Sequence, residues 1–166
     1  KKALPLLING LEKLEYRGYD SAGIAIINSE TNCISCNKAE GKLKNLKSNL
    51  NDHNIPGTVG IGHTRWATHG KPEVKNAHPH TDSSGNIAVV QNGIIENFQD
   101  LKNKLEEEGI IFNSDTDTEV IPHLIQRELS TLSKLNLENN GSTLLVAVRN
   151  VLSDLEGSYA LAVLWS

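Results

Sequence analysis

Apolar residues recur along the chain with two periods, one typical of helices and one typical of strands. Near the start, leucine and isoleucine fall every three or four positions, which predicts an amphipathic helix over residues 4–15. The apolar run over residues 22–27 predicts a strand, and residues 33–38 are expected to return beside it as a hairpin partner. A short helix is expected over residues 42–50, and a strand over residues 58–64.

In the middle of the chain, apolar residues follow neither the helix period nor the strand period. Residues 65–85 are rich in histidine, proline and glycine, and an irregular segment of this length inside a compact domain is more often functional than idle. Residues 87–90 predict a buried strand. The dipeptide Asn92-Gly93 that follows is a strong hairpin-turn signal.

Three helices and a last strand are expected after this turn. A helix is predicted over residues 98–108, and the spacing of Thr116 and Glu119 is that of a capping box, which predicts a second helix running to about residue 129. Residues 142–155 predict a third helix before a last strand. Its expected apolar face carries Leu145, Val148, Leu152 and Leu155.

Strands joined as hairpins, with helices on their outer faces, predict an α+β fold with antiparallel sheets. The sequence contains no repeat, low-complexity tract or linker, so one domain is expected over residues 1–166. It has no methionine, and residues 160–166 resemble the middle of a strand. The domain is therefore expected to be incomplete at both ends.

The composition of the chain argues against several classes of function, including nucleic-acid binding and membrane insertion. Hydrophobic residues make up 38% of the chain and charged residues 22%, so a packed core is feasible. The formal net charge of -4 argues against sequence-independent binding to nucleic acid, which requires a basic surface. No apolar run reaches the roughly 18–20 residues of a membrane span, and the start lacks a signal-peptide pattern. Two cysteines in a chain of this length favour a reducing cytoplasm.

A metal site is the first chemical alternative. Cys33 and Cys36 form a C-x-x-C, but a second cysteine pair is missing and the motif lies in a predicted strand, so two ordinary thiols are favoured. Four histidines lack a standard ligand spacing, and polar contacts within the long loop are favoured for them: His63, His69, His78 and His80. A metal-binding or interaction module stays open as a competing hypothesis.

Two other features could bind an anion. Arg65 follows a predicted strand directly, and its planar guanidinium matches a carboxylate, with Trp66 beside it to exclude water. A structural salt bridge is an equally good interpretation of Arg65 alone. Asn92-Gly93 is either a plain hairpin turn or an oxyanion hole made by the asparagine amide and the glycine N–H.

Five segments occur in the order and at the spacing of one known family. They are residues 14–23 (LEYRGYDSAG), 62–70 (GHTRWATHG), 76–80 (NAHPH), 92–97 (NGIIEN) and 114–120 (SDTDTEV). Together they resemble the glutaminase domain of the glucosamine-6-phosphate synthase family, which belongs to the class II glutamine amidotransferases. The resemblance runs over the whole chain. Gln91 departs from it, since the family usually has histidine there, and Pro122 is also unusual.

The resemblance implies an N-terminal-nucleophile hydrolase with four αββα layers. The family's nucleophile is a cysteine at the mature N-terminus, in a Cys-Gly-Ile-Val-Gly strand that residues 1–166 do not contain. Two sugar-isomerase domains follow in the family. The chain is therefore expected to be a partial glutaminase domain that is inactive alone, and Cys33 and Cys36 are not expected to replace the missing thiol.

The resemblance also assigns roles to residues. Asn92 and Gly93 would stabilise the oxyanion, Arg65 would hold the glutamine α-carboxylate, and Asp117 would hold the α-ammonium. Pocket-lining roles go to Trp66, Thr68 and His69. Supporting roles go to Arg17, Tyr19 and His78, of which His78 is expected to support the loop rather than touch substrate. No metal or cofactor is implied.

The function implied is hydrolysis of L-glutamine to supply ammonia for converting fructose 6-phosphate to glucosamine 6-phosphate. The fructose 6-phosphate would bind to the absent isomerase domains, and the parent enzyme is expected to be a cytoplasmic homo-oligomer. One alternative is the glutaminase of another class II amidotransferase, such as the phosphoribosyl pyrophosphate enzyme. Another is a catalytically inert fragment.

Overall fold

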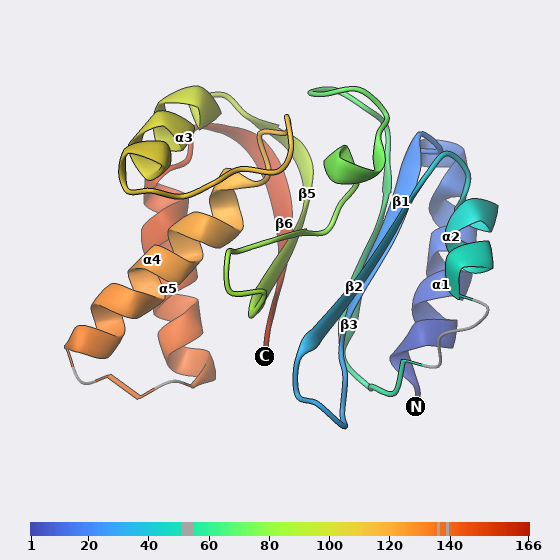
Figure 1. The fold of residues 1–166 in the computed structure, drawn as a ribbon, viewed down its shortest axis with the longest axis horizontal. Coiled ribbons are helices and arrows are strands. Elements are labelled where there is room, and N and C mark those ends of the chain that lie inside the picture. The colour runs from blue at the N-terminus through green and yellow to red at the C-terminus, as the bar shows by residue number, and fades with distance from the viewer. Residues whose placement is uncertain (51–54, 136, 139) are drawn as a thin grey trace.

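The computed structural model describes residues 1–50, 55–135, 137–138 and 140–166. The described chain forms four layers, in which two antiparallel sheets face each other and helices cover both outer faces (Figure 1). This arrangement confirms the predicted α+β class and the αββα order of layers.

The first sheet has the strand order β2-β1-β3. Its strands are β1 (Ser21–Ile27), β2 (Ile34–Glu40) and β3 (Gly60–Arg65), and β1 pairs antiparallel with both neighbours. Its outer face is covered by α1 (Ala3–Leu14) and α2 (Leu43–Leu50). The β1–β2 hairpin and the helices α1 and α2 therefore lie where the sequence predicted them. β3 does so as well, and it extends one residue further than predicted, to Arg65.

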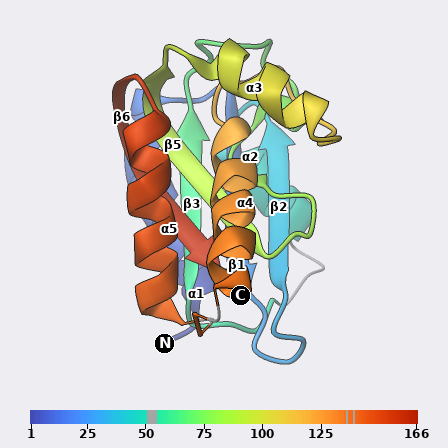
Figure 2. The same cartoon turned by 90° about the vertical axis from the view of Figure 1, so that its left-hand side faces the viewer.

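The second sheet has the order β4-β5-β6. Its strands are β4 (His80–Thr81), β5 (Ile87–Ile95) and β6 (Gly157–Trp165). The helices that cover it are α3 (Phe98–Glu107), α4 (Val120–Lys134) and α5 (Gly141–Asp154). Figure 2 shows α4 and α5 side by side across this sheet. Short 3-10 turns, Glu15–Arg17 and Val74–Asn76, interrupt the connecting segments.

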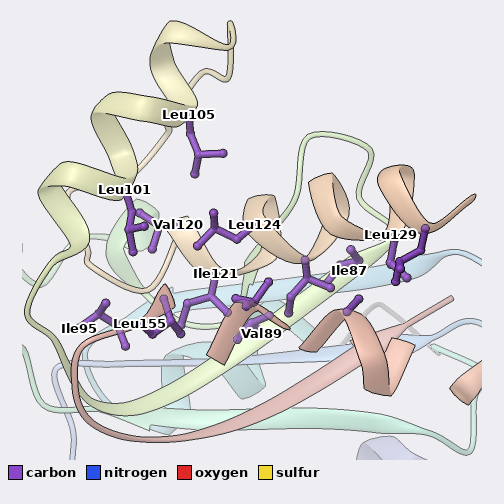
Figure 3. Packing of buried hydrophobic residues seen from close by; sticks show 14 residues of the cluster. Ile87, Val89, Ile95, Leu101, Leu105, Val120, Ile121, Leu124, Leu129 and Leu155 are labelled. Atoms are coloured by element: carbon purple, nitrogen blue, oxygen red, sulfur yellow. The ribbon is translucent and has the colours of Figure 1, made fainter. Parts of the chain in front are cut away.

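The larger core lies between the second sheet and its helices (Figure 3). Ile87 and Val89 of β5 meet Ile121 and Leu124 of α4, and all four side chains are almost completely buried. A smaller cluster joins the two sheets and includes Ala25 and Ala88. Small side chains at this contact let the two sheets approach closely.

The predicted hairpin turn at Asn92-Gly93 is wrong. β5 runs through both residues and pairs with β6, with Asn92 opposite Ala160 and Gly93 opposite Tyr159. Gly93 has φ +131°, and a Cβ atom there would lie 2.1 Å from the carbonyl oxygen of Ser158. The pairing with a nine-residue partner strand overrides the local turn preference of the dipeptide.

The predicted capping box is also wrong. α4 begins at Val120, and its N-cap residue Glu119 makes no side-chain capping bond. The Glu119 carboxylate instead accepts hydrogen bonds from the backbone amides of Asn113 (2.9 Å) and Ser114 (2.7 Å). The acid therefore organises the loop before the helix. Pro122 lies in the first turn of α4, where its missing N–H is not needed.

The predicted apolar face of α5 needs a partial correction. Leu145 and Leu152 are 60% and 38% exposed, whereas Ala147 and Val151 are buried. Val148 and Leu155 do contact the core. The helix is turned relative to the prediction because α4 and the sheet contact the side that carries its smaller residues.

Candidate functional site

A cavity of about 300 Å³ lies where the ends of β3 and β5 approach each other. Its lining residues are Arg17, His63, Thr64, Arg65, Trp66, Thr68, His78, Gln91, Asn92, Gly93, Ile94 and Asp117. Eight of the ten residues singled out from the sequence are among them. Tyr19 and His69 are the two that are not.

Arg65 is the cationic group of the cavity. It ends β3, is 4% exposed, and donates through Nη2 to the carbonyl oxygens of His69 and of Gly70 (3.3 Å). Its Nη1 has no hydrogen-bond partner among the described residues. Burial lowers the pKa of Arg65, while the nearby carboxylates of Asp20 and Asp117 act in the opposite direction. Hydrogen bonds at Nη2 hold the Arg65 guanidinium in place, while Nη1 can still donate to the carboxylate of a ligand.

The segment before β1 supports the loop that follows Arg65. Asp20 Oδ2 accepts a hydrogen bond of 2.9 Å from the amide of Ala67, and the Asp20 amide donates to the Arg65 carbonyl at 3.1 Å. The Tyr19 ring lies edge-on to the Trp66 ring, with centroids 5.3 Å apart. Tyr19 therefore lies behind Trp66, on the side of a larger and more open hollow of about 530 Å³. That hollow contains no other residue singled out from the sequence, so we place the site in the smaller cavity.

His69 contributes its backbone rather than its ring to this arrangement. Its carbonyl oxygen accepts from Arg65, whereas its imidazole lies edge-on to Phe98, with centroids 5.4 Å apart. The ring is thus a link between the loop and the start of α3. Its predicted contact with substrate stays a prediction.

Asp117 is the anionic group of the cavity. It is 3% exposed, and its Oδ2 accepts a hydrogen bond of 2.8 Å from the backbone amide of Ile95. Arg65 and Asp117 therefore place one cation and one anion in one cavity. This pair complements the zwitterionic head group of a free α-amino acid.

Asn92 and Gly93 lie on β5, on the opposite sheet from Arg65. Side-chain amides and backbone N–H groups are the donors from which oxyanion holes are built. Both residues line the cavity, so these donors lie beside the Arg65–Asp117 pair. The cavity is thus lined by a cation, an anion and hydrogen-bond donors from both sheets.

Three histidines lie together, His78 and His80 buried and His63 partly buried. The His63 and His78 rings stack with centroids 4.6 Å apart, and His80 lies edge-on to His78. Burial, with a contribution from Arg65, lowers the pKa of His63 to about 4, and burial and Lys38 lower that of His80 to about 3. Burial also lowers the pKa of His78 well below its usual range. The stack is therefore neutral near neutral pH.

Sequence reasoning missed His63, Thr64, Gln91 and Ile94 as cavity residues. Strand alternation was the available signal for His63, because it is two residues before Arg65 in the same strand and shares its face. Gln91 was noted as a departure from the family. Thr118 lies in the segment 114–120 quoted above, but no role was assigned to it; it hydrogen-bonds to both His78 and Gln91.

The structure also locates the two thiols. Cys33 is exposed and Cys36 partly buried, both are free, and neither lines the cavity. Burial raises the pKa of Cys36. Within the described residues, no group of three or more histidine, cysteine or acidic side chains is arranged to hold a metal ion. No helix in that part of the chain is long and apolar enough to cross a membrane.

Comparison with known proteins gives a consistent result. The family of glutamine amidotransferase domains matches residues 22–136. The glutamine–fructose-6-phosphate aminotransferase (isomerizing) of Gloeobacter violaceus is 54% identical over 164 residues, which are 98% of this chain and 25% of that protein. The enzyme of the same name from Clostridium tetani is 51% identical over 166 residues, again covering 25% of its length. The chain thus spans about a quarter of these relatives.

Solved structures agree on the fold. The glutamine phosphoribosylpyrophosphate amidotransferase of B. subtilis, solved with ADP and GMP, aligns with a TM-score of 0.77 at 30% identity. The alignment covers 99% of this chain and 33% of that one. A structure described as the allosteric regulatory enzyme of purine biosynthesis aligns with a TM-score of 0.76 at 32% identity. The chain therefore has the fold of the class II amidotransferases, the N-terminal-nucleophile hydrolase fold.

Proposed function

Since the chain belongs to the family of glutamine amidotransferase domains, we propose that it is the glutamine-hydrolysing part of an isomerising glutamine–fructose-6-phosphate aminotransferase. One observation carries the proposal: a partly unpaired arginine, a carboxylate and an Asn-Gly pair line one cavity. These groups match the carboxylate, the ammonium and the side-chain carbonyl of glutamine.

Glutamine is oriented by its head group in this proposal. The α-carboxylate pairs with Arg65 and the α-ammonium with Asp117, while Trp66 and Thr68 line the remaining wall. The side-chain carbonyl then points toward Asn92 and Gly93 on the second sheet. Arg17 supports the cavity wall, with Tyr19 behind Trp66.

The nucleophile is the family's terminal cysteine, which is not among residues 1–166. Its α-amine, with a reference pKa near 7.7–8.0, accepts the thiol proton close to neutrality. The thiolate adds to the glutamine carbonyl carbon, and the oxyanion receives hydrogen bonds from Asn92 and Gly93. The C–N bond breaks and ammonia leaves with the transferred proton. Water then cleaves the thioester to give glutamate and free the thiol.

Two branches of the family differ in the substrate that accepts the ammonia, which is fructose 6-phosphate in one and phosphoribosyl pyrophosphate in the other. Fructose 6-phosphate, converted to glucosamine 6-phosphate, is favoured by the aminotransferase relatives at 54% and 51% identity. The phosphoribosyl pyrophosphate enzyme is the second candidate, but its solved relative is only 30% identical. A cytoplasmic location and a homo-oligomeric parent enzyme stay predictions.

The test uses the full-length protein that carries this chain. Glutamate release from glutamine is measured alone, with fructose 6-phosphate and with phosphoribosyl pyrophosphate, and the amino-sugar product is identified by mass spectrometry. We expect glutamate and glucosamine 6-phosphate in equal amounts with fructose 6-phosphate. Glutamate release coupled to phosphoribosyl pyrophosphate would support the second branch, and no glutamate release at all would contradict the proposal.

A further inference from the structure

Alternate backbone amides of β5 point away from β6. In an antiparallel pair only every second residue hydrogen-bonds to the partner strand. The even-numbered residues of β5 bond to β6, so the N–H groups of residues 87, 89, 91, 93 and 95 point to the edge of β5 opposite β6. The first two of these are satisfied there. Ile87 donates to Asp82 Oδ1 at 2.7 Å, and Val89 pairs with His80 of β4.

Past the end of β4, the N–H groups on this edge of β5 donate to side chains instead of to a neighbouring strand. The amide of Gln91 donates to Nδ1 of His78 at 3.3 Å, and the amide of Ile95 donates to Asp117 at 2.8 Å. Gly93 lies between these two capped positions. His78 and Asp117 therefore fix the backbone on both sides of Gly93. By the same alternation the N–H of Gly93, which lines the cavity, is directed away from β6.

The hydrogen bonds around His78 define its tautomer. The Thr118 hydroxyl donates its single proton to Gln91 Oε1 at 2.9 Å, so it can only accept from His78 Nε2, which lies 3.2 Å away. The proton of the neutral imidazole is thus on Nε2, and Nδ1 is a free acceptor for the Gln91 amide. The three residues close a ring in which Gln91 is held through both its backbone and its side chain.

We infer that His78 is a positioning residue of the oxyanion hole, acting through the Gln91 amide, and that Thr118 sets the tautomer this role requires. The inference rests on the proposed function, because it assigns a purpose to the geometry around Gly93. A residue that only stabilised the core would change the free energy of unfolding and the amount of folded enzyme. A positioning residue changes the turnover number of the folded enzyme.

The kinetic test compares three variants of the full-length protein with the wild type. Loss of one oxyanion donor lowers turnover by about 10²–10³-fold, and displacement of a donor should cost a part of this. We expect Thr118→Val and His78→Leu to lower kcat for glutamine hydrolysis by roughly 10-fold and roughly 10²-fold, with KM within about twofold. His78→Asn keeps an acceptor near the position of Nδ1 and should recover most of the kcat lost in His78→Leu. Thr131→Val, which removes an exposed hydroxyl on α4, is the matched control.

A spectroscopic readout separates this inference from the proposed function. In protein labelled with 15N in the histidine rings, His78 should show protonated Nε2 and bare Nδ1, and Thr118→Val should move it toward a mixture of tautomers. A wild type that does not hydrolyse glutamine would refute the proposed function while leaving this spectrum unchanged. Protonated Nδ1, or unchanged kcat in folded Thr118→Val beside an active wild type, would overturn the positioning role. A kcat of His78→Asn as low as that of folded His78→Leu would overturn it as well. If His78→Leu does not fold, Thr118→Val and the histidine spectrum carry the test.

Discussion

Asp117 accepts a hydrogen bond of 2.8 Å from the backbone amide of Ile95, two residues beyond Gly93. The residue proposed to bind the substrate ammonium is therefore tied directly to the strand that carries the oxyanion donors. In the proposed function, substrate binding and catalysis therefore depend on one carboxylate, and two substitutions of Asp117 should separate these two contributions.

Asp117→Asn removes the charge but retains an oxygen acceptor for the Ile95 amide. We expect the KM for glutamine to rise by at least about 30-fold, corresponding to about 2 kcal/mol for an unpaired buried charge, with little change in kcat. Asp117→Ala removes the acceptor as well and should lower kcat in addition. Steady-state glutaminase assays on both variants measure this separation, and equal kcat values for Asn and Ala would argue against it.

Arg65→Ala should abolish most of the affinity for glutamine. The variant removes the cation proposed to bind the α-carboxylate and releases the His69 and Gly70 carbonyls, so we expect KM to rise by about 30-fold or more. Arg127→Ala is the matched control, because it breaks an exposed pair with Glu108, neither of which lines the cavity, and should have almost no effect. Isothermal titration with glutamate, the product, provides a second measure. An unaltered affinity in Arg65→Ala would refute the assigned role.

The buried histidines predict a loss of stability in mild acid. Burial lowers the pKa of His63 from 6.5 to about 4, so between these values the unfolded chain binds more protons than the folded chain. Its contribution is fully present above about pH 6.5 and falls as pH decreases toward about 4. Between about pH 7 and about pH 5, the free energy of unfolding should drop by about 2 kcal/mol through His63 alone.

His63→Gln provides the comparison for this prediction. Urea unfolding at the two pH values should show a smaller drop for the variant than for the wild type, because glutamine does not titrate. His80, whose pKa is about 3, should contribute in the same direction in both proteins. Identical drops would show that His63 is not held neutral in the folded chain.

Gly93→Ala should disrupt the strand as well as the site. At φ +131° an L-residue is strained, and the new Cβ would lie 2.1 Å from the Ser158 carbonyl oxygen, so we expect a loss of stability above about 2 kcal/mol together with loss of activity. Gly10→Ala makes the same chemical change inside α1, where nothing lies within 4 Å, and should stabilise the protein by up to about 1 kcal/mol. Thermal unfolding of both variants measures the contrast. Equal shifts in the two would contradict the close approach at Gly93.

The parts of the fold that the sequence predicted are those in which local period and burial agree. The hairpin of β1 and β2 and the helices α1 and α3 follow from their own residues. Asn92-Gly93 and the α4 start depend on distant partners, since β6 extends β5 and Glu119 turns to the amides of residues 113 and 114. No local pattern contains those partners.

The site residues likewise fall into those that the sequence indicated and those that depend on distant partners. Arg65 was a candidate because it follows a predicted strand at an irregular loop, although a structural salt bridge was an equally good interpretation. The family resemblance supplied its role, and the roles of Asp117 and Asn92-Gly93. The ring of Gln91, Thr118 and His78 could not be found, because its members meet only when the two long loops pack on the second sheet.

The cavity is shared between the two sheets, with Arg65 supplied by the first and Asn92, Gly93 and Asp117 supplied by the second half of the chain. In the proposed function, glutamine contacts Arg65 of the first sheet through its carboxylate, and Asp117, Asn92 and Gly93 of the second half through its ammonium and side-chain carbonyl, so it would connect the two halves. Separation of the sheets would then require loss of the ligand, so occupancy would lengthen the lifetime of the folded domain against proteases.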